Sequence, residues 1–242
     1  MKVLVIGGSG KVGTLTLTRL AAQHDIRVFD LRPPSYGSVE YVEGSVGDLD
    51  ALMGALQGID VLLYMAMGGY HIPGRDPFEL VEARIDAFDV NVKGVHMALF
   101  AAHKSGLAHA VYTSSMSIYR DNGIREGGTD EETPPDSNHV YGLTKRLGEE
   151  VCRSACRAWG MSVNALRLCF PVSTEEWLGR ARRDEPTIMT TGEDVAGALL
   201  RALEYRDGFQ AFTICGDYEQ KLLNIAKAKR LLDWEPRARP VR

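Results

Sequence analysis

The stretch "KVLVIGGSGKVGTLTLTRLAAQ", residues 2–23, decides the fold. Its apolar, β-branched start over 2–7 predicts a buried strand, and the apolar spacing over 11–23 predicts a helix. Gly7, Gly10 and Gly13 span the junction from the strand to the helix. Gly7 permits a tight turn, Gly10 leaves room for a pyrophosphate, and Gly13 lets helix and strand pack closely. The stretch predicts a dinucleotide site, with a glycine-rich turn that binds nothing as the alternative.

Strands and helices alternate along the rest of the chain. The predicted strands span 26–30, 39–44, 60–67, 109–115, 162–168 and 210–215, and the predicted helices span 48–58, 78–105, 139–158, 192–205 and 224–233. Strands that are apolar along their whole length form a parallel sheet covered on both faces. We therefore expect the α/β class, with a doubly wound parallel sheet of the Rossmann type. Residues 1–171 would form the dinucleotide-binding core with the catalytic residues. Residues 172–242 would add a small C-terminal substrate cap and the closing helices, all within one compact domain.

Composition excludes several classes of protein. Of the 242 residues 45% are hydrophobic and 25% are charged, which predicts a packed core. The net charge is −4 and no basic stripe suggests nucleic acid or a membrane surface. No apolar run reaches the roughly 18 residues that span a bilayer, and no signal peptide is evident, so a cytoplasmic enzyme is expected. The cysteines at 152, 156, 169 and 215 lack zinc spacing, so we expect reduced thiols and no metal.

Two aspartates follow predicted strands and bear on the choice of cofactor. Asp30 ends the second strand, where a carboxylate binds the adenosine ribose and repels a 2′-phosphate. This position favours NAD, although a turn aspartate is the alternative reading. Arg32 and Lys11 are cations that would reach a 2′-phosphate, so NADP stays open. Asp48 follows the third strand, where it caps the next helix or accepts a hydrogen bond from the adenine amino group.

Tyr141 and Lys145 lie one helical turn apart in "NHVYGLTKRLGEE", residues 138–150. An isolated tyrosine has a pKa of about 10, and bringing it near 7 requires about 4 kcal/mol of preferential phenolate stabilisation. A lysine one turn away and an oxidised nicotinamide together supply such a field. The spacing therefore predicts an acid/base pair, although a surface pair with this spacing also arises by chance.

In its ordered motifs the chain resembles the extended short-chain dehydrogenase/reductases, the NAD-dependent epimerase/dehydratase proteins. The resemblance covers about residues 1–171 and continues weakly in "GEDVAGALLRAL" (192–203) and "AKRLLDWEPR" (228–237). The motifs that carry it are the glycine stretch, Asp30, Asp48, "DVNVKG" (89–94), "VYTSSMSIY" (111–119), "DEETPPDSNHVYGLTK" (130–145) and "LRL" (166–168).

The resemblance implies a catalytic set and a reaction. Tyr141 matches the acid/base, and Lys145 matches the lysine that assists it and binds the nicotinamide ribose. Ser115 matches the residue that holds the substrate oxygen beside Tyr141. Ser114 is the other candidate for this role. In the alternative reading, the Ser115 hydroxyl only bonds to the backbone at the end of the strand. Asn91 matches a structural or proton-relay asparagine of the long helix. The implied reaction transfers a hydride between nicotinamide and a sugar or sugar-acid-like alcohol or carbonyl.

Two segments depart from the family pattern. "YMAMGGYH" (64–71) and "CFPVSTEEW" (169–177) suggest an altered substrate wall. Only 97 residues follow Lys145, which favours a single sugar over a nucleotide sugar. This length and the acidic loop at 125–138 resemble compact uronate dehydrogenases. The candidate substrate contacts are Tyr70 and His71 in the loop at 68–77, and Arg167, Arg180, Arg182 and Arg183, with solvated surface as the alternative for each arginine.

Two other functions stay open, and a partner is expected. One is a nucleotide-sugar epimerase or dehydratase that recycles its cofactor, and the other is an NAD(P)-sensing regulator without catalysis. The resemblance also implies a homodimer through the 78–105 and 139–158 helices. The dimer contact would use a helix face of small and apolar residues, unless that face packs only on the sheet. The residues of this face are Ala87, Val90, Gly94, Met97, Ala98 and Ala101.

Overall fold

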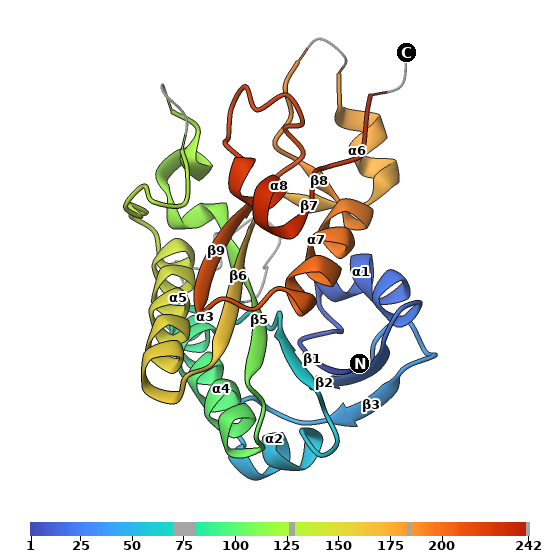
Figure 1. Cartoon of the computed structure of the whole chain (residues 1–242), viewed down its shortest axis with the longest axis vertical. Helices are drawn as coiled ribbons and strands as arrows, with labels where there is room; N and C mark the ends of the chain where they lie inside the picture. The colour runs from blue at the N-terminus through green and yellow to red at the C-terminus, as the bar shows by residue number, and fades with distance from the viewer. Residues whose placement is uncertain (70–80, 126–128, 183–184, 241–242) are drawn as a thin grey trace.

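A computed structural model describes residues 1–69, 81–125, 129–182 and 185–240. Its centre is a seven-stranded parallel sheet in the order β3-β2-β1-β4-β5-β6-β9 (Figure 1). The strands are β1 (Lys2–Ile6), β2 (Asp25–Asp30), β3 (Glu40–Glu43), β4 (Val61–Tyr64), β5 (His109–Ser115), β6 (Ser162–Leu168) and β9 (Phe209–Ile214). The predicted doubly wound sheet is therefore confirmed. Strand order reverses between β1 and β4, and ligands of such sheets bind beyond the strand ends at that point.

Helices cover both faces of the sheet (Figure 1). One face packs against α1 (Lys11–Ala21), α7 (Gly192–Glu204) and α8 (Ala226–Leu232), and the other against α2 (Leu49–Ala55), α4 (Val95–Lys104) and α5 (Val140–Trp159). In β1, Val3 and Val5 join the first core, whereas Leu4 and Ile6 join the second. Successive strand side chains point to opposite faces, so an entirely apolar strand is the expected outcome of burial on both sides.

The predicted long helix consists of three parts. These are α3 (Val81–Phe88), a π-helical turn η2 (Asp89–Gly94) and α4. Turns of this kind are often found at functional sites. The sequence pattern does not reveal the wider turn, because a segment of six residues is too short to show a period of its own.

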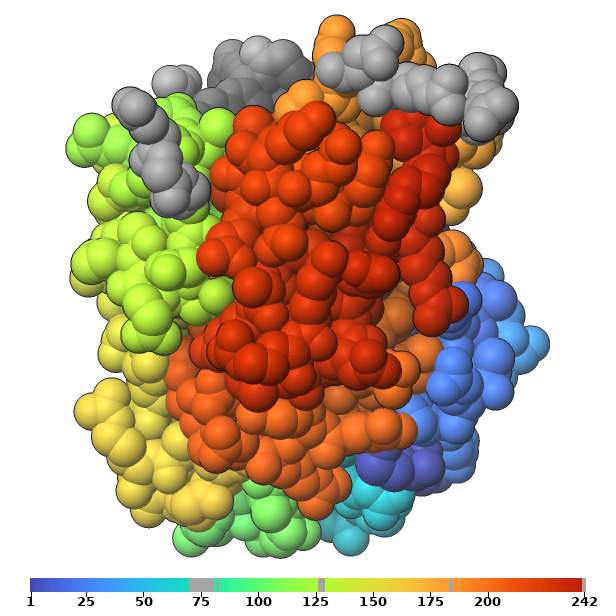
Figure 2. All heavy atoms as spheres, turned by 45° about the horizontal axis from the view of Figure 1, so that its top comes forward, coloured from blue at the N-terminus to red at the C-terminus, as the bar shows by residue number. Residues whose placement is uncertain are grey.

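Residues after 171 contribute to two parts of the molecule. Strand β9 and helix α7 belong to the main sheet and its cover, whereas α6 (Thr174–Arg180) and the paired strands β7 (Pro171–Val172) and β8 (Thr190–Thr191) form a smaller unit. Figure 2 shows the last part of the chain, orange to red, covering the middle of one face. The sequence did not predict α6, although Ser173 caps it by accepting a hydrogen bond from the Glu176 backbone N–H at 3.0 Å.

The small-residue face expected to form a dimer lies inside the molecule. Ala87, Ala98 and Ala101 are fully buried, and a β-carbon on Gly94 would lie 2.7 Å from the Tyr64 hydroxyl oxygen. Met97 packs on the same core, and Val90 is half-buried. Small side chains let the helix approach its own sheet closely. The alternative reading, in which this face packs on the sheet, is therefore the right one, and the prediction that it meets a second copy was wrong.

Candidate active site

The structure brings Ser115, Tyr141 and Lys145 together at the carboxyl end of β5. Ser115 is the last residue of β5, and the other two lie in the first turns of α5, which packs beside it (Figure 1). The side chains of Ser115 and Tyr141 are hydrogen-bonded. Burial raises the pKa of the half-buried Tyr141 phenol, whereas its bond with Ser115 lowers it. The serine therefore lies beside the phenol, and its role in holding a substrate oxygen there stays a prediction.

Lys145 is buried and held by β5. Its Nζ donates a hydrogen bond to the backbone oxygen of Thr113 at 2.9 Å and lies 5.1 Å from the centre of the Tyr112 ring. Burial lowers the pKa of Lys145 to about 8, against the opposing effects of Cys152 and Glu149. The carbonyl and the ring face both stabilise an ammonium in this buried place. Neither contact was predicted from the sequence.

Two glycines let α5 lie this close to β5 and to the 3-10 turn at Met116–Ile118 that follows it. A β-carbon on Gly142 would lie 2.0 Å from the Ser117 backbone oxygen, and one on Gly148 would lie 2.4 Å from the Tyr112 hydroxyl oxygen. The two glycines lie on either side of Lys145 in the chain. No side chain fits at either position without a shift of backbone or ring, so these contacts set the distance between α5 and β5.

The competing serine is engaged elsewhere. Ser114 is buried, and its hydroxyl donates a hydrogen bond to Glu149 Oε1 at 2.6 Å. Ser115 makes the bond with Tyr141 instead, and its Oγ also accepts from the Ser117 backbone N–H at 3.1 Å. The geometry therefore favours Ser115 over Ser114 as the substrate-binding serine. The capping bond to Ser117 shows that the functional and the backbone-capping readings of Ser115 are compatible.

Asn91 links three elements from the π-helical turn. Its side-chain oxygen accepts a hydrogen bond from the Gly68 backbone N–H at 3.0 Å, and its amide nitrogen donates to Thr144 Oγ1 at 3.1 Å. The side chain is fully buried. With both ends of the amide engaged by protein, the contacts support the structural reading of Asn91, in which it fixes the segment after β4 against α5.

The glycine stretch has the tight geometry that the sequence predicted. Gly7 has φ +83°, and a β-carbon there would lie 2.3 Å from the Ala66 Cα. A β-carbon on Gly13 would lie 2.0 Å from the Gly8 backbone oxygen. A β-carbon on Gly10 would meet nothing closer than the Gly7 oxygen at 3.3 Å, so this glycine leaves space outside the loop at the start of α1. This is a fit for a pyrophosphate at a helix N-terminus.

Asp30 joins the glycine loop to the end of β2. Its Oδ2 accepts from the Ser9 backbone N–H at 3.0 Å, and its Oδ1 lies 3.4 Å from the Arg32 backbone nitrogen, which donates to it. A carboxylate has about four acceptor sites, so capacity for ribose hydroxyls remains. Asp48 caps α2 by accepting from the Ala51 backbone N–H at 3.0 Å. The capping reading of Asp48 is confirmed, and adenine contact stays a prediction.

The three candidate substrate arginines that the structure describes have partners elsewhere. Arg167 is buried, and its Nη2 lies 2.8 Å from Glu149 Oε2 in an ion pair, so it is occupied inside the core rather than facing a substrate or solvent. Arg180 is exposed and pairs with Glu176, and Arg182 donates to backbone carbonyl oxygens in its own turn. Three further candidates, Tyr70, His71 and Arg183, lie outside the described residues.

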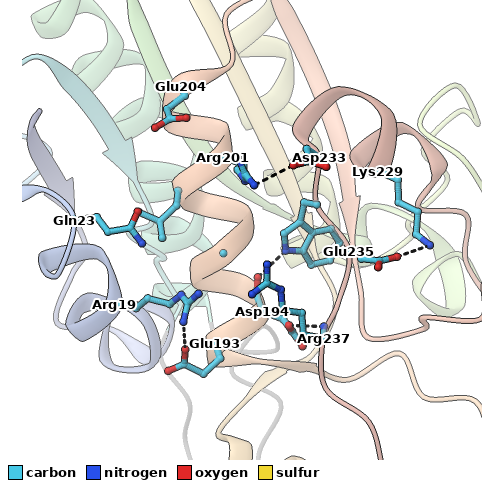
Figure 3. A pocket seen from close by; sticks show the side chains of 13 residues that line it. Arg19, Gln23, Glu193, Asp194, Arg201, Glu204, Lys229, Asp233, Glu235 and Arg237 are labelled. Carbon is cyan, nitrogen blue, oxygen red and sulfur yellow. Dashed lines mark hydrogen bonds and ion pairs between the residues drawn. The ribbon is translucent and has the colours of Figure 1, made fainter.

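A separate hollow of about 620 Å³ lies between α1, α7 and the closing segment (Figure 3). Three ion pairs lie along it: Arg19 with Glu193, Arg201 with Asp233 and Lys229 with Glu235. None of the predicted catalytic residues lines it. Within the described ranges, no cluster of three histidine, cysteine or acidic residues is arranged to hold a metal ion. No helix in that part of the chain has the length and apolar character needed to cross a bilayer.

Comparisons with known proteins give the family. Residues 3–215 match the NAD dependent epimerase/dehydratase family. The 3 beta-hydroxysteroid dehydrogenase/Delta 5-->4-isomerase of Mycobacterium tuberculosis is 33% identical over 69% of this chain and 46% of its own. The L-arabinose 1-dehydrogenase (NAD(P)(+)) of Haloferax volcanii is 22% identical over 98% of this chain and 96% of its own. The chain thus spans less than half of the first curated relatives but nearly all of the Haloferax volcanii protein.

Solved structures agree on the fold. A short-chain dehydrogenase/reductase superfamily protein from Agrobacterium tumefaciens with bound NAD is similar with a TM-score of 0.81 and 22% identity, covering 98% of this chain and 93% of that one. A mutated uronate dehydrogenase has a TM-score of 0.77 and 19% identity, covering 98% and 82%. The family match over most of the chain agrees with the order of the motifs and with the reversal of strand order in the sheet. The chain belongs to the NAD-dependent epimerase/dehydratase family.

Proposed function

We propose that the protein is an NAD-dependent dehydrogenase that oxidises an alcohol carbon of a small sugar or sugar acid, or reduces the matching carbonyl. The observation that carries this proposal is the meeting of Ser115, Tyr141 and buried Lys145 at the carboxyl end of β5. A regulator that only binds a dinucleotide has no need of a phenol, a hydroxyl and a buried ammonium held in this arrangement.

In this mechanism each residue has one task. Gly7, Gly10 and Gly13 would hold the pyrophosphate and Asp30 the adenosine ribose. Bound NAD would supply the hydride acceptor and a positive charge that favours the phenolate. The Ser115 hydroxyl holds the substrate oxygen, and the Tyr141 oxygen takes its proton as general base. Lys145 stays protonated nearby, which favours the phenolate over the phenol and offsets the opposing effect of burial.

One relative favours a free sugar over a nucleotide sugar. The Haloferax volcanii L-arabinose 1-dehydrogenase matches this chain over nearly the whole of both proteins, whereas the UDP-glucose 4-epimerase of Lactobacillus helveticus is matched over 51% of its length. The epimerase reading has its own support, because solved neighbours include proteins in complex with UDP-glucuronic acid and NAD. It therefore remains the second candidate.

The test is a substrate panel with NAD. Uronic acids, aldoses and nucleotide sugars are each incubated with the protein, NADH absorbance is followed, and sugar products are analysed for inversion of configuration. We expect net NADH formation with at least one free sugar or sugar acid. Inversion of a nucleotide sugar without NADH release, and no activity on free sugars, would establish the epimerase instead.

We also propose that the protein is a homodimer through the outer face of α3 and the start of α5. Val81, Ile85 and Phe88 are 65%, 58% and 41% exposed, and their spacing places them on one side of the helix. Leu143 of α5 is exposed as well. Analytical ultracentrifugation at micromolar concentration should give about twice the 26.6 kDa mass of the chain, and Ile85→Asp should give the monomer. A monomeric unmodified protein would contradict the proposal.

A further inference from the structure

Behind Lys145 lies a buried polar network centred on Glu149. Its Oε1 accepts hydrogen bonds from Arg167 Nε at 3.0 Å and from the Ser114 hydroxyl at 2.6 Å. Its Oε2 accepts from Arg167 Nη2 at 2.8 Å. All three side chains are buried. The guanidinium thus binds the carboxylate in a bidentate manner, and the hydroxyl adds a third hydrogen bond. This geometry fixes the position of the carboxylate and pairs its charge.

Arg167 is anchored on its other side. Its Nη1 donates to the Tyr119 hydroxyl oxygen at 2.6 Å and to the Glu131 backbone oxygen at 3.2 Å. Burying an unpaired charge is costly, and here the anchored guanidinium pairs with the carboxylate, with Nη2 2.8 Å from Oε2. The network thereby connects β5, β6 and α5 behind the candidate catalytic residues.

Glu149 lies one helical turn after Lys145, so the two side chains are on one side of α5. The other groups facing the Lys145 ammonium are the Thr113 carbonyl and Tyr112 ring of β5 and, on α5, Cys152 and Tyr141. Burial raises the pKa of the Cys152 thiol and the Tyr112 phenol well above their ordinary values, so both stay neutral near pH 8. While they are neutral, Cys152 and Tyr112 oppose the desolvation of Lys145 little, and Tyr141 opposes it only as the phenolate. The ion-paired Glu149 carboxylate opposes it with a full negative charge.

We propose that Glu149, held by Arg167 and Ser114, is a positioning residue for the reaction, which keeps the buried Lys145 protonated at the pH where Tyr141 must act. The inference rests on the proposed function only for its catalytic consequence. The effect on the charge of Lys145 stands by itself. Arg167, considered from the sequence as a substrate ligand, here acts through Glu149.

The test compares Glu149→Gln with Glu150→Gln. Glu150 is the exposed neighbour on α5, paired with Arg153, so the control removes the same charge from the solvent side. A lysine with a lowered pKa loses its proton as pH rises through about 8. In Glu149→Gln this loss should begin about one pH unit lower, and the alkaline limb of kcat/KM should move with it. The control should keep the unmodified profile.

A substrate-free readout separates this inference from the proposed function. The ¹³Cε signal of Lys145, identified by its absence in Lys145→Met, is titrated by NMR in each variant. A midpoint lowered in Glu149→Gln and unchanged in Glu150→Gln supports the inference even if no sugar is turned over. Equal midpoints in the two variants would overturn it even if the enzyme is active.

Two further variants distinguish charge from folding. Glu149→Gln leaves the Arg167 guanidinium uncompensated, whereas Glu149→Gln/Arg167→Met removes both charges. The double variant should recover thermal stability but keep the lowered midpoint, because Lys145 still lacks its carboxylate. Glu149→Asp should restore part of the midpoint. If the double variant recovers the unmodified midpoint, the lowered midpoint of Glu149→Gln comes from the uncompensated Arg167 guanidinium. That result would refute the role of Glu149.

Discussion

Replacement of Tyr141 by phenylalanine should lower turnover by about 10²–10⁴-fold and leave NAD affinity near its unmodified value. The phenol oxygen is the group hydrogen-bonded with Ser115. The neighbouring His139 ring stacks on the Tyr141 ring with 6.4 Å between centroids, and its Nδ1 accepts a hydrogen bond from the Gly142 backbone N–H. Phenylalanine keeps the ring and its packing, so the change removes the proton acceptor without emptying the site. The measurement is kcat on the sugar identified in the panel, together with dinucleotide titration by fluorescence.

A matched control for this variant is Tyr36→Phe. Tyr36 lies between β2 and β3, outside α5, and packs on the core that α1 and α7 cover, so losing its hydroxyl should leave turnover unchanged. Ser115→Ala should raise KM and lower kcat because the substrate oxygen loses its partner. Full activity in Tyr141→Phe would exclude the mechanism, whatever the protein binds.

Asp30→Asn should reduce the preference for NAD over NADP by roughly 10–100-fold, the usual effect of losing a hydrogen bond to a charged group. The amide oxygen can still accept from the Ser9 backbone N–H, so the glycine loop stays in place while the charge is lost. Loss of the carboxylate also removes the repulsion of a 2′-phosphate. The measurement is the ratio of dissociation constants of the two dinucleotides.

Two further variants complete the test of the cofactor. Asp30→Ala removes the bond to the loop as well, so it should weaken both dinucleotides. Arg32→Ala in the Asp30→Asn background should abolish any gain in NADP binding, because it removes the nearest cation in sequence. Tighter binding of NADP than of NAD by the unmodified protein would contradict the assignment and point to Arg32 or Lys11.

The sequence predicted every strand of the main sheet, because most of them are apolar runs buried on both faces; the edge strand β3 is the least buried. It also placed Tyr141 and Lys145 on one side of a helix, since a four-residue spacing is a local property of the chain. It did not predict β7 and β8, because two-residue strands leave no periodicity to detect. The choice between Ser114 and Ser115 likewise depended on which side chain of α5 each one meets.

The sequence pattern could not predict contacts between residues that lie far apart in the chain. Arg167 looked like a free cation in "LRL", yet its partner lies 18 residues earlier in another element. Only the position of Glu149, four residues after Lys145, was a visible signal, and it does not reveal that the carboxylate is buried. The face with Ala98 and Ala101 was misread for the same reason: spacing shows that a helix has an apolar side but not which surface covers it.

The close packing of α5 at Gly142 and Gly148 has a consequence for how this protein can diversify. With both glycines in contact, the helix cannot slide or rotate, so the positions of Tyr141 and Lys145 relative to Ser115 are insensitive to changes elsewhere. The smaller unit of β7, α6 and β8 is not part of that contact. Mutations there can accumulate without disturbing proton transfer. Directed evolution toward new sugars should therefore find its useful changes within residues 171–191 and almost none along α5.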